Sequence, residues 1–117
     1  MSTFKWGFVG AGMIAKKALY PAITRSNVGE IYAVASRDAK KALTISPNGK
    51  IYLDYDQLFA DPEVDGVYIS LPNAFHLPVA IRAMKAGKHV LCEKPLGMNA
   101  AEVREAMDVA AKAGVLF

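Results

Sequence analysis

Two charged side chains follow directly after an apolar segment late in the sequence. The run Lys88–Cys92 has the pattern of a buried strand, and Glu93 and Lys94 come next. At a strand end, an ammonium group can hydrogen-bond a substrate hydroxyl or lower its pKa, and a carboxylate can hold a ribose or orient the lysine. Lys94 is therefore the candidate catalytic residue, and Glu93 and Lys94 are both candidate cofactor-binding residues. By position alone, a solvated pair in a loop is an equally good interpretation.

A glycine motif near the N-terminus points to a bound dinucleotide. After an apolar strand pattern, the sequence reads G-x-G-x-x-A from Gly10 through Gly12 to Ala15. In dinucleotide-binding folds the first glycine permits a tight turn, the second lets the backbone approach a diphosphate, and the third small residue lets helix and sheet pack closely. The N–H groups of the following helix then bind the anion. The candidate cofactor-binding residues here are Gly10, Gly12, Met13 and Ile14; a ligand-free strand-to-helix turn is the alternative.

The end of the second strand pattern, residues 30–36, bears on which dinucleotide binds. Ser36 and Arg37 stand where many such folds place an acid that binds the ribose 2′-hydroxyl. A carboxylate there repels a 2′-phosphate, whereas a serine hydroxyl and an arginine guanidinium can bind one. The sequence therefore predicts NADP rather than NAD. Asp38 fits a helix cap better than the role of that acid, and the alternative for Arg37 is an ordinary solvated side chain.

A further group of candidates follows the fourth strand pattern, residues 66–71. Leu71 and Pro72 form an apolar shelf and a proline-directed turn, which can pack under an adenine or a nicotinamide ribose. Asn73 can supply a hydrogen bond to the same ligand. His76 is a fourth candidate cofactor-binding residue, although a lone histidine in a first helical turn is commonly a cap or a surface group.

Strand-like and helix-like patterns alternate along the whole chain. Apolar runs predict strands at 4–9, 30–36, 50–53, 66–71 and 88–92, with a sixth strand only begun at 115–117. Helical spacing predicts helices at 14–23, 39–43, 55–60, 74–86 and 100–113, and residues 46–49 form a turn cluster. This alternation predicts an α/β fold with a doubly wound, Rossmann-type parallel sheet and helices on both faces. Ligands bind such sheets at the carboxyl ends of the strands, where the candidates above stand.

Local residues mark the expected helix ends. Asp38, Asp54 and Asn99 are of the types that accept hydrogen bonds from the free N–H groups at a helix start. Gly87 and Gly114 follow the last periodic residues of two helices, as glycine often does at a helix end. The apolar face expected for the last helix is Val103, Ala106, Met107 and Ala110.

The composition limits the classes of protein that fit. With 117 residues, 53% hydrophobic and 21% charged, the chain predicts one globular domain, residues 1–117. Its net charge of +3 comes from lysines and arginines scattered among acids, so no nucleic acid partner is expected. The longest uncharged run, 66–81, is too short and too broken by prolines to cross a membrane. The single cysteine, Cys92, is expected as a packed core thiol and fits the cytoplasm; no metal site is expected.

Five segments together resemble a known family. They are Gly10–Ala15, Ala35–Asp38, Tyr68–Asn73 with His76, Ala86–Pro95 and Ala113–Phe117. These segments closely resemble the N-terminal domain of the glucose-fructose oxidoreductase and inositol dehydrogenase family, and the resemblance covers essentially the whole chain. It implies reversible hydride transfer between NAD(P) and a sugar, cyclitol or related hydroxyl carbon. It also implies that Lys94 lies beside the nicotinamide and the substrate hydroxyl.

The chain departs from that family in length. Family members carry a second domain with an open antiparallel sheet, which supplies most substrate contacts and the usual oligomer interface. We therefore expect these residues to be a fragment that binds the dinucleotide, with little turnover alone, and that meets a small polyol or sugar only with the further domain. The alternatives are a nucleotide-binding module without chemistry and an engineered minimal scaffold, which could form a homodimer through the sixth-strand edge.

Overall fold

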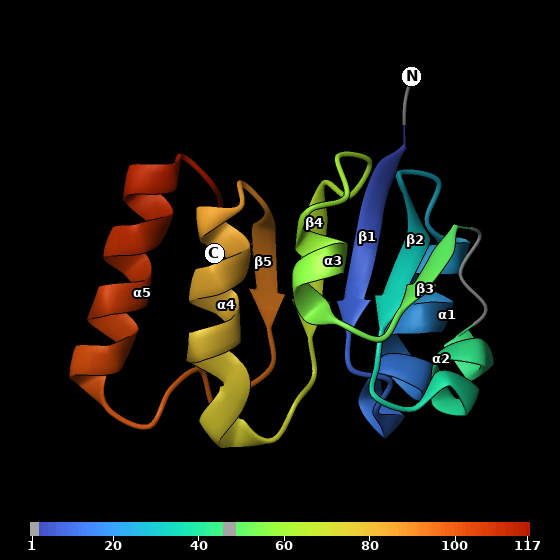
Figure 1. The fold of residues 1–117 in the computed structure, drawn as a ribbon, viewed down its shortest axis with the longest axis horizontal. Coiled ribbons are helices and arrows are strands. Elements are labelled where there is room, and N and C mark those ends of the chain that lie inside the picture. Colours follow the sequence, from blue (N-terminus) through green and yellow to red (C-terminus); the bar gives the residue numbers. More distant parts are fainter. Residues whose placement is uncertain (1–2, 46–48) are drawn as a thin grey trace.

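A parallel sheet of five strands forms the centre of the molecule (Figure 1), in a computed structural model that describes residues 3–45 and 49–117. The strands are β1 (Phe4–Val9), β2 (Gly29–Ala35), β3 (Lys50–Tyr52), β4 (Gly66–Ile69) and β5 (His89–Cys92). Their order is β3-β2-β1-β4-β5, and every neighbouring pair is parallel. The expected Rossmann-type fold is confirmed, while the turn expected at 46–49 lies outside the described residues except for its last position.

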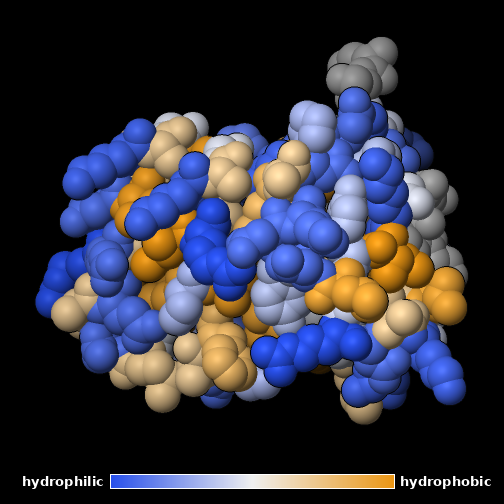
Figure 2. Space-filling view, viewed as in Figure 1, coloured by the Kyte–Doolittle hydropathy of each residue, from blue (hydrophilic) through white to orange (hydrophobic). Residues whose placement is uncertain are grey.

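Helices cover both faces of this sheet, as predicted. They are η1 (Ala15–Leu19), α1 (Tyr20–Arg25), α2 (Ala39–Ile45), α3 (Tyr55–Phe59), η2 (Asn73–Phe75), α4 (His76–Lys85) and α5 (Ala100–Ala113). Side chains of α3, α4 and α5 join one buried cluster with the strands, and side chains of η1, α1 and α2 join another. Figure 2 shows hydrophobic surface between α4 and α5, with mostly hydrophilic residues over the outer helix. Among the described helices, none is both long and apolar enough to cross a membrane.

Neighbouring residues of the central strands face opposite clusters. Phe8 and Tyr68 belong to the cluster under η1 and α1, whereas Val9 and Ile69 belong to the cluster under α3 and α4. This explains why the strand runs are apolar almost without interruption. The cover is less complete at the edge of the sheet, because the side chain of Leu91 in β5 is 46% exposed.

The helix ends lie where local residues predicted them. The side chains of Asp38, Asp54 and Asn99 each accept a hydrogen bond, at 2.9 Å, from a main-chain N–H two or three positions later. These bonds satisfy N–H groups that have no partner within the helix. Gly87 and Gly114 have φ angles of +84° and +70°, which a glycine adopts without strain.

The helix after the glycine motif has a π-helical stretch that is followed by an α-helical one. The five residues of η1 form a π-helix, and α1 continues as an α-helix with Pro21 in its first turn. Ala15 in η1 and Ile23 in α1 are both buried in the same cluster. The expected helix over 14–23 therefore forms with one wider turn.

Two expectations near the C-terminus need correction. Met107 is 60% exposed, because α5 packs against α4 along a narrow stripe that takes up Ala106 and Ala110. Residues 115–117 are not a strand. Two hydrogen bonds tie them to β5: the N–H of Val90 donates to the carbonyl of Leu116 at 2.9 Å, and the N–H of Leu116 donates to His89 Nδ1 at 2.9 Å. Among the described residues, β5 is therefore the edge strand of the sheet and no sixth strand lies beside it.

A buried polar cluster fixes the loop before β4. Lys88 is 7% exposed, and its Nζ donates to the carbonyl oxygens of Asp61 at 2.8 Å and Val64 at 2.6 Å. The hydroxyl of Tyr52 donates to the Asp61 carboxylate at 2.8 Å. Burial lowers the pKa of Lys88, whereas burial and the bond to Asp61 raise the pKa of Tyr52 to about 12. Tyr52 in β3 and Lys88, directly before β5, thus hold this loop through hydrogen bonds.

Replacing Tyr52 with Phe tests this cluster. The variant loses a hydrogen bond to a carboxylate, so its free energy of unfolding should fall by roughly 1 kcal/mol near neutral pH. Because the folded pKa of Tyr52 is about 12 and its unfolded value is about 10, the tyrosine stabilises the fold below pH ~10 and loses that effect as the pH rises to ~12. Urea unfolding of both proteins should show a difference that narrows across this window. A difference independent of pH would contradict the assignment.

Candidate functional site

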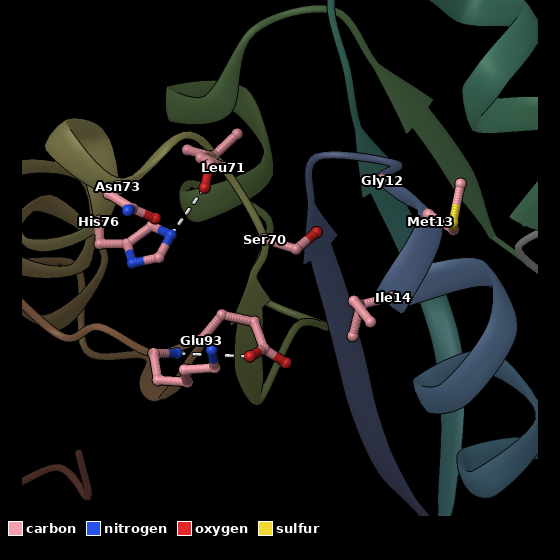
Figure 3. A pocket seen from close by; sticks show the side chains of 9 residues that line it. Gly12, Met13, Ile14, Ser70, Leu71, Asn73, His76 and Glu93 are labelled. Carbon is pink, nitrogen blue, oxygen red and sulfur yellow. Dashed lines mark hydrogen bonds between the residues drawn. The ribbon is translucent and has the colours of Figure 1, made fainter.

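A cavity of about 400 Å³ opens at the carboxyl ends of β1, β4 and β5 (Figure 3). Three segments line it, and each follows one of these strands. They are Gly12–Ile14 after β1, residues of 70–76 after β4, and Glu93 with Lys94 after β5. The strand order reverses between β1 and β4, since β2 lies on one side of β1 and β4 on the other. The cavity therefore occupies the switch point at which doubly wound sheets bind ligands.

The two glycines of the motif are needed for different reasons. Gly10 has a φ of +89°, and a Cβ there would lie 2.6 Å from the carbonyl oxygen of Ser70. The fold itself therefore requires glycine at position 10. At Gly12 the nearest atoms to an added Cβ are Ser70 Oγ at 3.7 Å and the Ser70 carbonyl oxygen at 3.8 Å, an ordinary contact. The chain has room for a side chain at Gly12, and the space it would take belongs to the cavity.

The helix that begins after Gly12 starts at the cavity, where its first main-chain N–H groups lack partners within the helix. Helical residues start at Met13, and the N–H of Lys16 donates to the carbonyl oxygen of Gly12 at 3.1 Å. The first N–H groups of any helix lack such a partner, and the helix dipole favours an anion beside them. Met13 and Ile14 line the cavity and are exposed, so a bound ring would cover apolar surface. Ala15 is fully buried, as close packing of helix and sheet requires.

Ser70 is a cavity residue that the sequence did not single out. Its Oγ is buried and has no hydrogen-bond partner among the residues that the structure describes. Figure 3 shows this hydroxyl pointing from the end of β4 toward β1. A buried hydroxyl without a partner is costly, so its place beside the Gly12 turn suits a polar ligand. In the sequence, a serine at the end of an apolar run carries no such signal.

His76 is a buried side chain, neither a cap nor a surface group, and each of its ring nitrogens lies beside a main-chain carbonyl oxygen. Its exposed fraction is 1%. Nδ1 lies 2.8 Å from the carbonyl oxygen of Pro95, and Nε2 lies 2.7 Å from that of Leu71, the contact drawn in Figure 3. The ring thus connects the segment after β4 to the segment after β5. It lines the cavity together with Leu71 and Asn73.

Glu93 is held by a tyrosine rather than by the Lys94 ammonium. The hydroxyl of Tyr68 donates to Glu93 Oε1 at 2.7 Å, and the main-chain N–H of Lys94 donates to Oε2 at 3.3 Å. Burial and the bond to Glu93 raise the pKa of Tyr68. Lys94 itself is exposed, and within the described part of the chain its ammonium has neither a hydrogen bond nor an ion pair. The ammonium is therefore available to a ligand in the cavity.

A second cavity of about 450 Å³ shares one wall with the first. Leu71 lines both, and the other lining residues are Arg37, Tyr55, Pro72, Phe75, Val79 and Arg82. Pro72 and Arg37 were candidates, while the aromatic residues and Arg82 were missed. In the sequence, the signal for them was a phenylalanine, Phe75, that follows closely after a strand pattern. Arg82 forms an ion pair with Asp56 across α4 and α3.

Ser36 and Asp38 form the turn that leads into α2. Ser36 is buried, and its Oγ accepts a hydrogen bond from the N–H of Asp38 at 3.2 Å. The Asp38 carboxylate accepts from Lys40 N–H, as a helix cap does. This confirms the cap role expected for Asp38. Neither Ser36 nor Gly10 lines the two cavities, whereas the exposed Arg37 lines the second.

Comparison with known proteins identifies the family. The model of an oxidoreductase family with an NAD-binding Rossmann fold, GFO/IDH/MocA, matches residues 4–117. The chain belongs to this family. No group of three or more His, Cys, Asp or Glu side chains that could hold a metal ion occurs among residues 3–45 and 49–117.

The relatives named here are each longer than this chain. It is 38% identical over 116 residues to 1,5-anhydro-D-fructose reductase of Ensifer adhaerens, covering 97% of this chain and 34% of the reductase. It is 36% identical over 117 residues to trans-1,2-dihydrobenzene-1,2-diol dehydrogenase of Xenopus tropicalis, covering 97% of this chain and 36% of that enzyme. The crystal structure of KijD10, a 3-ketoreductase from Actinomadura kijaniata in complex with NADP, matches with a TM-score of 0.94 and 32% identity over 99% of this chain and 38% of that one. The chain therefore spans about a third of the length of these family members.

The two glycines give a paired test of the site. Gly12→Ala should change the free energy of unfolding by less than about 0.5 kcal/mol and weaken binding of NADPH at least about tenfold, because its methyl group fills cavity space. Gly10→Ala should lower the free energy of unfolding by about 2 kcal/mol or more, since it adds a left-handed alanine and a clash with a carbonyl. Urea unfolding and NADPH fluorescence titration measure both. Unchanged NADPH binding in Gly12→Ala would contradict this assignment of the cavity.

Proposed function

We propose that residues 1–117 are the NADP-binding domain of an oxidoreductase that transfers a hydride between the nicotinamide and a sugar, cyclitol or related hydroxyl compound. The observation that carries this proposal is the cavity at the switch point. It joins the Gly12 turn, the buried Ser70 hydroxyl without a partner and the free Lys94 ammonium. Family membership supports the cofactor class.

The residues present fit such a cofactor along its whole length. The diphosphate would lie against the main chain at Gly12, where the helix N–H groups and the Ser70 hydroxyl can donate to it. The adenine end would lie in the second cavity, between Arg37 and the shelf of Leu71 and Pro72. The nicotinamide end would lie toward Asn73, His76, Glu93 and Lys94. When bound, the nicotinamide supplies or accepts the hydride.

The preference for NADP rests on the turn after β2. The carboxylate nearest to it, Asp38, is already engaged as the cap of α2. In the described part of the chain the exposed guanidinium of Arg37 has no ion pair, so it is free to bind a 2′-phosphate. The crystal structure of KijD10, which has the same fold, is that of its complex with NADP.

Lys94 is the residue we assign to the chemistry. Its free ammonium can hydrogen-bond the oxygen of a hydroxyl or carbonyl carbon and stabilise negative charge that develops there. Relatives named as reductases of anhydrofructose and dehydrogenases of a diol support a substrate with this oxygen chemistry. Because those enzymes are about three times as long, we assign substrate selection to residues outside these 117 and expect little turnover from this domain alone.

Cofactor choice can be tested at the turn after β2. In the double variant Ser36→Asp, Arg37→Ala, the dissociation constant for NADP should rise about tenfold to a hundredfold, since charge-assisted bonds to the 2′-phosphate are lost and a repelling carboxylate is added. The constant for NAD should change less than about threefold. Arg25→Ala, which removes an exposed arginine at the end of α1 away from both cavities, is the matched control. An unchanged ratio of the two constants in the double variant would refute the preference.

The role of Lys94 is tested by Lys94→Ala. Binding of NADPH should change less than about fivefold, because the diphosphate and adenine contacts remain. With a family C-terminal domain joined to the chain, turnover of sugars and cyclitols should fall at least about a hundredfold. The control is Lys112→Ala, at the far end of α5. Equal turnover in Lys94→Ala and the control would remove Lys94 from the mechanism.

A further inference from the structure

The turn that bears Lys94 is short and exposed, yet both of its neighbours are tied to buried side chains. Glu93 precedes Lys94 and accepts from the Tyr68 hydroxyl at 2.7 Å. Pro95 follows it, and its carbonyl oxygen lies 2.8 Å from His76 Nδ1. Both side chains come from the neighbouring strand β4 or the segment after it. The two contacts lie on either side of Lys94, whose ammonium has no partner among the residues that the structure describes.

Tyr68 is a rigid anchor because its ring is packed in the core. It belongs to the cluster under η1 and α1, and its ring meets that of Phe8 edge-on, with centroids 5.2 Å apart. Its hydroxyl donates to the carboxylate of Glu93, the residue that follows β5. That carboxylate in turn accepts from the main-chain N–H of Lys94. A packed ring therefore fixes the backbone of Lys94 through one intermediate side chain.

His76 is the second anchor, and it acts on the other side of Lys94. The ring is almost fully buried, and each nitrogen faces a main-chain carbonyl, from Leu71 or from Pro95. A carbonyl can only accept, so a neutral ring, which has one N–H, donates to one of the two carbonyls and packs against the other, whereas a protonated ring donates to both. The ring thereby holds the turn after β5 at a fixed distance from the turn after β4. Those two turns form opposite parts of the cavity wall.

We propose that Tyr68 and His76 are positioning residues, which clamp the Glu93–Pro95 turn from both sides so that the Lys94 ammonium stays at the cavity. This inference rests on the proposed role of Lys94. Each anchor comes from β4 or the helix after it, so the clamp also couples the β4 side of the cavity to the β5 side. Loss of either contact frees a turn that is otherwise exposed, while the core around it stays packed.

The chain offers matched controls for both anchors. Tyr52 is a half-buried tyrosine whose hydroxyl also donates to a carboxylate, at 2.8 Å, in a cluster that does not line the cavity. Tyr52→Phe therefore repeats the chemical change of Tyr68→Phe away from Lys94. His89 accepts one hydrogen bond, from the N–H of Leu116 at 2.9 Å, at the start of β5. His89→Leu is the corresponding control for His76→Leu.

The experiment measures amide hydrogen exchange by NMR in the 117-residue chain without ligand. In Tyr68→Phe and His76→Leu, the Lys94 amide should exchange about tenfold faster or more than in the parent chain. The two control variants should leave that rate within about twofold. His76→Gln, which keeps an N–H donor for one carbonyl, should restore part of the protection. Equal acceleration in Tyr68→Phe and Tyr52→Phe, or none in Tyr68→Phe, would overturn the clamp; Tyr68→Phe decides the matter if His76→Leu does not fold.

A titration with NADPH separates this proposal from the proposed function. If the parent chain binds NADPH and the exchange results are as expected, both stand. If the parent chain does not bind NADPH, the proposed function fails, and the exchange rates still decide whether Tyr68 and His76 hold the turn. If NADPH binds and Lys94 exchange is unaffected in both anchor variants, the clamp is wrong and the cofactor site is retained.

Discussion

The close approach of the ends of β1 and β4 is the constraint on which this site depends. At Gly10 the main chain comes so near to the Ser70 carbonyl that no side chain fits between them. This contact brings the two strands together while their following segments turn away in opposite directions, one into η1 and the other toward α4. The opening between those segments is the cavity. Gly12, Ser70 and the Lys94 turn then need only to line a space that the sheet topology has already created.

The sheet also explains why the polar groups of the site come from distant parts of the sequence. Tyr68 and Glu93 are neighbours in space because β4 pairs with β5 in parallel, which brings their carboxyl ends to the same edge. The same pairing places His76 next to the Pro95 carbonyl. At the other end of β4, the buried Lys88 holds the preceding loop. Its ammonium donates to two carbonyl groups of that loop. Side-chain bonds thus tie the loops to the sheet on both sides of β4.

How far the sequence could predict this structure depends on the range of each interaction. The caps at Asp38 and Asn99 and the stop at Gly114 depend on residues within one helical turn, so local patterns found them. The fold class followed from the alternation of strands and helices. The partner of Glu93, the unbonded Ser70 hydroxyl and the buried Lys88 depend on contacts between distant segments, which no local pattern contains. The prediction that Met107 lies on the buried face of α5 was wrong for the same reason. The width of that face depends on how α5 packs against α4, and no local pattern contains this contact between two helices.

The wide turn of η1 explains how one helix serves both the glycine motif and the core. Ala15 and Ile23 are eight positions apart, whereas two turns of an α-helix take about seven residues. A π turn takes up one residue more than an α turn, and this brings the two side chains onto the same buried face. The start of the helix can therefore follow the geometry of the glycine turn while its later part keeps its own register in the core. The wide turn also lies just before Pro21, which has no N–H to donate, so the helix changes its winding where one intrahelical bond is missing in any case.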